Sequence, residues 1–210
     1  MNNSKQFIEC SEEIIKDNLI EIPEIIYDQS IFEIKGSKIK VKKEGTVNLN
    51  FKYKENKPFQ KIISKENEIT YCPSFIKYFE ITLNDIDESA ISIGVISSPD
   101  KLKKQRMVGW DKRTIVLHND GKIYNENDYN GVEATQPLKK NDIIGCGFNL
   151  ITNEIFFTVN GKLIEKKFTL FGEELCHAIG FENYENKIIQ LILEIKNHLN
   201  MILFHIYKHF

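Results

Sequence analysis

The stretch from Asp142 to Phe168, DIIGCGFNLITNEIFFTVNGKLIEKKF, constrains the fold more than any other part of the sequence. From Ile155 to Val159 every second side chain would face the same side of a strand, because successive residues of a β-strand point to opposite faces. Asn160-Gly161 follows immediately, and this dipeptide is typical of a two-residue hairpin turn. The stretch therefore predicts three short strands joined by tight turns, at Asp142–Phe148, Glu154–Val159 and Lys162–Phe168.

The same period of two recurs in other parts of the chain. Ile39 and Val41 alternate with lysines, and the apolar residues of Val47–Phe51 alternate with asparagines. No helical periodicity separates the strands, which excludes a parallel sheet built from alternating strands and helices. Many short strands with turns between them indicate an all-β sandwich or barrel. Further strands are predicted at Tyr78–Leu83, Ile91–Ser97, Thr114–Leu117, Ile123-Tyr124, His177–Phe181 and Lys187–Ile195.

Three details of this pattern carry specific expectations. Gly94 lies inside a predicted strand, where a glycine usually marks a bulge or a close approach of another backbone. Ser97–Val108 is expected to be a long loop. Asn125–Gln136 is polar throughout most of its length, and we expect a second loop there.

Lysines are concentrated early in the chain. Residues 35–65 hold ten lysines against Glu44 and Glu55, although the formal net charge of the whole chain is -2. Alternation with apolar residues accounts for these lysines as the solvated face of strands, and a binding patch is the alternative. A nucleic-acid interface would favour the bidentate side chain of arginine, and the chain has only Arg106 and Arg113. We therefore expect neither nucleic acid nor a membrane surface as a partner.

The cysteines and the chain ends suggest an intracellular protein. Four cysteines without a C-x-x-C pair favour free thiols in a reducing compartment, and no signal peptide or apolar stretch of 18 residues is seen. A cytoplasmic or nuclear location is expected. Residues 1–21 are predicted to be an N-terminal helical extension, 22–195 the main domain and 196–210 an apolar C-terminal tail. The tail is open to three interpretations: a docked helix, an oligomer contact or an artefact of the gene model.

Several short blocks, in this order, resemble the SPRY domain, and within it the Ran-binding protein M type. The blocks are Tyr78-Phe79-Glu80-Ile81, Ile91-Ser92-Ile93-Gly94-Val95, Gly109-Trp110-Asp111-Lys112, His118–Tyr124, Asp142–Gly147, Phe156-Phe157-Thr158 and Asn160-Gly161. The turn at Leu117–Gly121 departs from the family pattern, since it lacks the usual first aromatic residue and first glycine. The resemblance implies a bent, concanavalin-like β-sandwich of two antiparallel sheets, flanked here by short helical appendages.

The resemblance also implies non-catalytic recognition of a peptide segment or protein surface. Family members bind through loops at one end of the sandwich, which by position correspond to Lys52–Lys57, Ser97–Val108 and Phe181–Asn186. Relatives often present clients to ubiquitin-ligase assemblies, but the LisH, CTLH and CRA segments of such scaffolds are not found in this sequence. The candidate apolar anchors for a ligand are Tyr53, Met107 and Phe181, and the candidate hydrogen-bonding residues are Lys54, Gln105 and Asn183.

Another group of residues is interpreted as structural. Trp110 is expected to anchor the loops, and Gly145 and Gly147 to thin a strand so that aromatic rings can lie against it. Asp120 is expected to hydrogen-bond within its own turn. The complete structural signature is Trp110, Asp111, Asp120, Gly121, Gly145, Gly147, Asn160 and Gly161.

The sequence leaves two other function classes open, a carbohydrate-binding domain and an enzyme. A carbohydrate-binding sandwich is the alternative, because Trp110 with Asp111, Asn119 and Asp120 could form a sugar site. An enzyme has the weakest support, since no set of nucleophile, base and orienting residue can be assigned. We therefore predict a protein-binding module with no catalytic residues, no cofactor and no metal.

Overall fold

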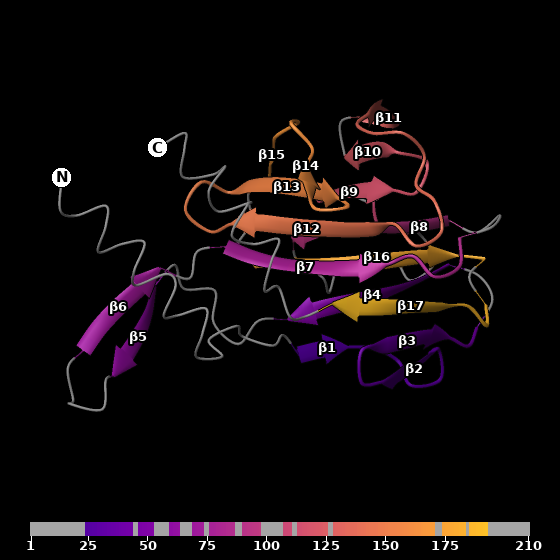
Figure 1. The fold of residues 1–210 in the computed structure, drawn as a ribbon, viewed down its shortest axis with the longest axis horizontal. Helices are drawn as coiled ribbons and strands as arrows, with labels where there is room; N and C mark the ends of the chain where they lie inside the picture. The colour runs from indigo at the N-terminus through magenta and orange to yellow at the C-terminus, as the bar shows by residue number, and fades with distance from the viewer. Residues whose placement is uncertain are drawn as a thin grey trace.

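A computed structural model of the chain describes residues 24–43, 46–52, 59–63, 69–73, 76–86, 90–97, 107–110, 113–125, 128–170, 174–183 and 185–192. Its strands form two antiparallel sheets packed face to face (Figure 1), which confirms the all-β sandwich. The helical segments predicted at 1–21 and 196–210 lie outside the described residues, and so do the domain boundaries at 22 and 195.

Sheet A has seven strands in the order β1-β4-β16-β8-β9-β10-β11. Every neighbouring pair in it is antiparallel. Its strands are β1 (Glu24–Ile26), β4 (Thr46–Lys52), β16 (Leu175–Glu182), β8 (Ala90–Ser97), β9 (Thr114–His118), β10 (Lys122–Asn125) and β11 (Asp128–Glu133).

Sheet B has eight strands in the order β14-β13-β12-β7-β17-β3-β2, with β15 also paired to β13. Its strands are β14 (Lys162–Leu163), β13 (Glu154–Val159), β12 (Ile143–Asn149), β7 (Ile76–Thr82), β17 (Ile188–Ile192), β3 (Lys38–Val41), β2 (Phe32–Lys35) and β15 (Phe168–Thr169). A separate hairpin consists of β5 (Phe59–Ile63) and β6 (Ile69–Pro73), and it is not among the strands predicted from the sequence.

The core lies between the two sheets and is built by alternate residues of their strands. The Phe51 ring of β4 lies 5.0 Å from the Phe79 ring of β7, so aromatic side chains of the two sheets meet directly. His177 of β16 is fully buried between Phe79 and Phe148, with ring distances of 4.7 and 4.8 Å. Burial of each phenylalanine ring stabilises the sandwich by about 1.5–3 kcal/mol.

Gly94 has the role that the sequence predicts. A Cβ atom at this position would lie 2.1 Å from the carbonyl oxygen of Ile115 and 2.6 Å from the Cα of Val116. Both atoms belong to the backbone of the neighbouring strand β9, so the expected close backbone approach is confirmed.

Two predicted connections differ from the structure. Asn125–Gln136 is not a loop throughout, because it contains β11, which pairs with β10 at the edge of sheet A. This strand is held by backbone hydrogen bonds and lacks an apolar period, and its register shifts between Ile123 and Asn125. The predicted strand Lys162–Phe168 is instead two strands of two residues each, because the chain between them turns through exposed residues.

Candidate functional site

Strand register decides which loops share an end of the sandwich. Leu175 pairs with Ser97, and two residues further along β16 His177 pairs with Phe51 of β4. The ends of β4 and β8 and the start of β16 therefore lie together, and we name this the Ser97 end. At the opposite end of the same strands Glu182 pairs with Thr46 and Ala90.

This register corrects the predicted recognition surface. The segments that follow Lys52 and Ser97 do begin at the same end of sheet A. The turn at Phe181–Asn186 begins at the other end, because β16 runs antiparallel to both β4 and β8. The expectation that all three loops lie at one end of the sandwich is therefore wrong.

Two of the predicted anchor residues are not exposed. Phe181 lies in β16 and is fully buried, with its ring 5.7 Å from that of Phe32 in the core. Alternation continues through this position, so Phe181 points inward like Ile179. Met107 is also buried, with 2% of its surface exposed. Neither side chain therefore reaches the surface, as the predicted role of apolar anchor would require.

The other predicted binding residues have different outcomes. Asn183 follows β16 immediately, is exposed and has a φ of 54°. It lies at the end opposite to Ser97. Tyr53, Lys54 and Gln105 lie outside the described residues, so their roles stay predictions.

A groove of about 250 Å³ opens between the sheets at the Ser97 end. Strand pairing places the groove at this end. Ile115 of β9 pairs with Asn125 of β10 on one side and with Val95 of β8 on the other. Next to them, Ser97 N donates a hydrogen bond to Arg113 O at 2.9 Å. The groove has an apolar floor, in which Ile115 and Leu170 also belong to the core. Its lining residues are Thr114, Ile115, Asn125, Lys167, Phe168, Thr169 and Leu170.

The polar side chains of the groove come from both sheets. Thr114 and Asn125 belong to sheet A, whereas Thr169 belongs to β15 of sheet B and is exposed. Lys167 forms an exposed ion pair with Glu154 at 3.3 Å, which contributes little to stability in water. The groove therefore offers hydroxyl, amide and ammonium groups above an apolar floor.

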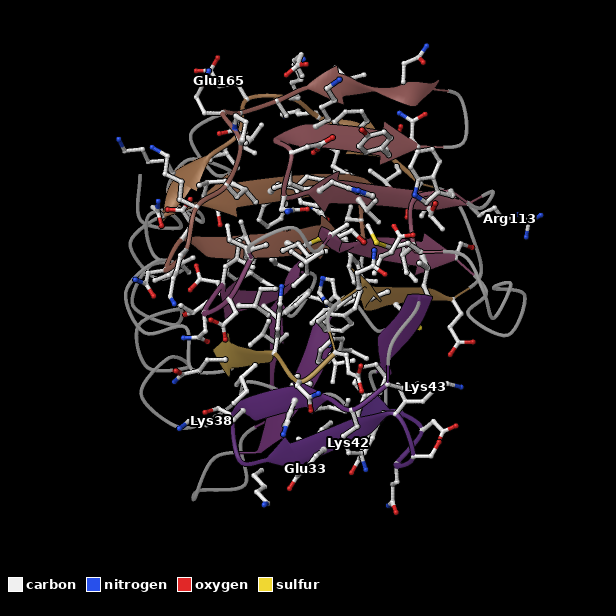
Figure 2. All side chains as sticks on the ribbon, turned by 90° about the vertical axis from the view of Figure 1, so that its right-hand side faces the viewer. Glu33, Lys38, Lys42, Lys43, Arg113 and Glu165 are labelled. Carbon is white, nitrogen blue, oxygen red and sulfur yellow. The ribbon has the colours of Figure 1, made fainter. Side chains whose placement is uncertain are left out.

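Arg113 stands immediately before β9 at this end. Its φ of 63° is in the left-handed region, which is uncommon for a residue other than glycine. The side chain is exposed and projects outward from the sandwich (Figure 2). A positively charged group thus lies one residue from the groove residue Thr114.

Sequence reasoning missed the groove residues. They come from separate segments, one around Thr114, one at Asn125 and one from Lys167 to Leu170. None of these segments carries a motif, and the packing of β15 on β13 and of β10 on β9 brings them together. No local signal in the sequence would have found them.

Trp110 lies on the outer face of sheet A. Its ring meets His118 edge-on at 6.2 Å and lies 5.3 Å from the ring of Tyr124. It is half-buried and packs against a small apolar cluster that includes Val108 and Val116. Burial lowers the pKa of His118 to about 4, so this imidazole is neutral at pH 7.

The residues of the carbohydrate alternative are engaged within the fold. Asp120 accepts hydrogen bonds from the Lys122 amide at 3.0 Å and from the Tyr124 hydroxyl at 2.7 Å. Asn119 Oδ1 accepts a hydrogen bond from Ile91 N at 3.1 Å. Trp110 packs against Tyr124, so these side chains stabilise the turn around Asp120 and do not form an open sugar-binding surface. Asp111 lies outside the described residues.

The glycines of β12 lie beneath a second cluster, on the outer face of sheet B. The Tyr78 ring stacks on Phe156 at 5.8 Å, and a Cβ at Gly147 would reach 2.2 Å from the Phe156 ring. The Tyr78 hydroxyl donates to Glu80 at 2.6 Å, and burial together with Glu80 raises the pKa of this phenol. At the hairpin that follows β13, Asn160 Oδ1 accepts from Ile143 N at 2.9 Å, and both Asn160 and Gly161 have positive φ.

Among the described residues, no three histidine, cysteine, aspartate or glutamate side chains are placed to hold a metal ion. Cys146 and Cys176 are buried free thiols, and burial raises the pKa of Cys146 well above its usual value. No helix long and apolar enough to cross a membrane occurs among the described residues.

Comparison with known families and proteins agrees with the resemblance seen in the sequence. A family model described as the SPRY domain matches residues 76–194, which is more than half of the chain. Human Ran-binding protein 9 is 28% identical over 107 residues, covering 51% of this chain and 14% of that protein. The predicted SPRY resemblance is confirmed, and its closeness to the Ran-binding type is supported.

Other curated relatives are also much longer than the matching region. The dual specificity protein kinase splA of Dictyostelium discoideum is 34% identical over 135 residues, covering 57% of this chain and 6% of that protein. Protein ssh4 of Sclerotinia sclerotiorum is 31% identical over 119 residues, covering 56% of this chain and 21% of that protein. The chain thus spans about a fifth or less of the length of these relatives.

Solved structures show the same fold. A crystal structure of a human SPRY domain has a TM-score of 0.55 at 19% identity, covering 81% of this chain and 97% of that chain. The SPRY domain of human HERC1 has a TM-score of 0.50 at 13% identity, covering 79% of this chain and 96% of that chain. At these identities the likeness concerns the fold alone.

Proposed function

Because this chain belongs to the SPRY family, whose domains are protein-interaction modules, we propose that it binds a short peptide segment of another protein in the groove at the Ser97 end. The observation that carries this proposal is the groove itself, where polar side chains from two sheets surround an apolar floor. The binding is non-catalytic.

The size and chemistry of the groove favour a peptide over a small-molecule cofactor. Its volume of about 250 Å³ is below the roughly 300–1,000 Å³ typical of small-molecule sites. It suits one or two side chains of an extended ligand whose backbone continues along the rim. The Thr169 hydroxyl and the Asn125 amide can hydrogen-bond such a backbone, while Phe168 offers apolar contact.

The floor of the groove consists of residues that already pack in the core, so a ligand would not have to order them. Ile115 is 4% exposed and Leu170 is 7% exposed, and both pack into the main core. A ligand side chain would therefore meet preformed apolar surface and would not have to order it. Strands β4 and β8, which precede Tyr53, Lys54 and Gln105 in the chain, end at the same end of sheet A, and we propose these three residues as further ligand contacts.

A wider role follows from the family. We propose that the chain presents the bound protein as a client-recognition or scaffold subunit in a ubiquitin-ligase-type assembly. Affinity capture from the native cell followed by mass spectrometry tests this role. Recovery of ligase subunits supports the ligase role. Their consistent absence from captures that retain other partners would contradict the ligase role without contradicting peptide binding.

Peptide binding is tested by selecting ligands from a random peptide library with the purified chain. Thr169→Arg should fill the groove and weaken binding of the selected peptides at least tenfold, or about 1.4 kcal/mol. Lys167→Glu should change which peptides bind, since it reverses a charge at the rim. Lys54→Glu and Gln105→Ala test the loop residues predicted from the sequence.

Lys162→Glu is the matched control. Lys162 is exposed on β14 of the same sheet, and its partner Val159 lies at the opposite end of β13 from Glu154. Selected peptides should bind this variant as well as the parent. Equal binding by the parent, Thr169→Arg and Lys162→Glu would show that the groove is not the site.

A further inference from the structure

A second surface, on the opposite part of sheet B, has unusual chemistry. Strands β2, β3 and β17 present their outer faces side by side. Glu33, Lys40 and Ile188 form one cross-strand row, and Lys35, Lys38 and Gln190 form the next. Lys42 continues the outward-facing series of β3, and we name these seven residues the basic face.

The basic face carries a strong local charge. Four lysines stand against Glu33 in a chain whose formal net charge is -2. Neighbouring strands are about 4.8 Å apart and alternate residues of a strand about 7 Å apart, within a Debye length of about 8 Å at physiological salt. The potentials of the lysines therefore add. At the border of the face, Glu185 and Lys187 contribute one charge of each sign.

Glu33 does not neutralise the face. It pairs with Lys35 at 2.6 Å, and 81% of the Lys35 side chain is exposed. Lys38 extends toward solvent beside Glu33 (Figure 2), and the Lys42 ammonium donates a hydrogen bond to the backbone carbonyl oxygen of Gln29. Lys38 and Lys40 thus remain as positive charge beside this pair, with Gln190 and Ile188 as their neighbours on β17.

An apolar residue lies within this charged surface. Ile188 is 36% exposed and is directly opposite Lys40 across the two strands. It is one of three large apolar side chains exposed among the described residues, with Tyr27 and Ile151. Protein–protein contacts commonly have an apolar centre within a polar rim, and here Ile188 is the apolar residue among polar and charged neighbours.

We propose that the basic face binds an acidic segment of a partner protein, with an apolar side chain of that segment seated on Ile188. Charge complementarity identifies the ligand as acidic. A protein is favoured over a nucleic acid because the face has lysines and no arginine or aromatic residue, so it offers neither bidentate base contacts nor a stacking platform. This surface is distinct from the groove, since it lies on the outer side of other strands.

Edge protection is the competing explanation. β2 is the last described strand of sheet B, and charged side chains on an edge strand discourage pairing with another chain. Protection needs charge of either sign, whereas binding of an acidic segment needs positive charge. Reversing the lysines separates the two explanations.

The test uses the full chain and a labelled dodecapeptide of alternating glutamate and threonine with one central leucine, measured by fluorescence polarisation. The parent chain should bind saturably, and the affinity should fall with added salt. Lys38→Glu combined with Lys40→Glu should weaken binding at least tenfold. Lys139→Glu combined with Lys162→Glu, which reverses two exposed lysines elsewhere, should leave it unchanged. Circular dichroism checks that each variant is folded.

A double-mutant cycle tests whether the leucine of the peptide contacts Ile188. Ile188→Thr in the chain and leucine to threonine in the peptide should each weaken binding a few-fold, and together no more than either alone. The proposal is overturned if the peptide does not bind, if the control pair weakens binding as much, or if the cycle is additive. It is also overturned if double-stranded RNA or phosphatidylserine vesicles bind more tightly and lose binding through the same lysines. Thr169→Arg should have no effect on this peptide.

Discussion

The hydroxyl of Tyr78 lies 2.6 Å from the hydroxyl of Thr158, and the two meet directly above Gly145 of the strand between them. Both side chains are buried on the outer face of sheet B, and Tyr78 also donates to the buried carboxylate of Glu80. A Cβ at Gly145 would lie 2.1 Å from the Tyr78 oxygen and 2.4 Å from the Thr158 oxygen. The contact therefore depends on the glycine beneath it.

Gly145→Ala should lower the free energy of unfolding by about 2–4 kcal/mol. The added methyl group overpacks the site, and the hydrogen bond between Tyr78 and Thr158 is lost as the side chains move. Urea unfolding measures the change. In the background of Tyr78→Phe the closest contact of the methyl group is gone, so the two changes should cost less together than the sum of each alone. Additive costs would contradict the steric explanation.

Gly94→Ala should destabilise the protein more than Gly147→Ala does. At Gly94 the new methyl group meets the backbone of β9, which cannot move without breaking strand pairing. At Gly147 it meets only the end of the Phe156 ring. Phe156→Leu should therefore recover part of the loss for Gly147→Ala in urea unfolding, and it should recover none for Gly94→Ala.

A loss below about 1 kcal/mol for Gly94→Ala would show that β8 and β9 tolerate a wider spacing than the structure has. Gly36→Ala serves as a comparison with no steric clash. Its φ of 58° makes alanine strained, but no atom lies within 4 Å of the added methyl group. Its cost should stay near 1 kcal/mol.

Strands with one buried face could be predicted from the sequence, and an edge strand could not. Ile39 and Val41 alternate with lysines because β3 has the core on one side and water on the other. β11 has no such alternation, because at the edge of sheet A its pairing with β10 and the positive φ of Gly131 determine the conformation. The polar sequence of that segment therefore predicted a loop.

The location of the candidate site was the part that could not be predicted. The family resemblance predicts Phe181 as an anchor in a binding loop, because Phe181–Asn186 corresponds by position to a recognition loop of the family. The structure puts it in the core and puts its turn at the end opposite Ser97. Which loops share an end depends on the order and direction of β4, β16 and β8, and these pairings join residues more than about 75 positions apart. A local pattern carries no information about them.

Asp120→Ala should destabilise the protein by about 1–2 kcal/mol. The substitution removes the hydrogen bonds from the Lys122 amide and the Tyr124 hydroxyl, and Asp120 itself is exposed, which limits the loss. Burial and this carboxylate raise the pKa of Tyr124 to about 12, so Asp120→Ala should also lower that pKa. NMR titration of the tyrosine ring measures the shift.

Tyr124→Phe is the control for the Asp120 prediction. It removes one of the two hydrogen bonds and leaves the one to Lys122 in place. Adding Tyr124→Phe to Asp120→Ala should therefore cost less than it does in the parent chain. An unchanged tyrosine pKa in Asp120→Ala would contradict the assigned contact.

Two buried histidines should make the fold less stable as the pH falls from 7 to 5. Burial lowers the pKa of His118 to about 4 and that of His177, with a contribution from Lys77, to about 3. The unfolded chain titrates near 6.5, so below that pH the unfolded state binds more protons than the folded state. The stabilisation is complete above pH 6.5 and is lost progressively as the pH falls toward 4 and 3. Each histidine should contribute about 1.2 kcal/mol per pH unit in the range from 6 to 5, because the unfolded chain is only partly protonated at pH 6.

Urea unfolding at pH 7, 6 and 5 measures this slope, in a range where most carboxylates stay ionised. His118→Phe keeps an aromatic ring against Trp110 and Tyr124, and His177→Phe keeps one between Phe79 and Phe148. Each substitution changes stability at pH 7 by an amount that depends on packing, so the slope is the quantity to compare. Each should reduce the slope between pH 6 and 5 by about 1.2 kcal/mol per pH unit, and the double variant should be nearly independent of pH there. A slope that both variants retain would show that other groups cause the pH dependence.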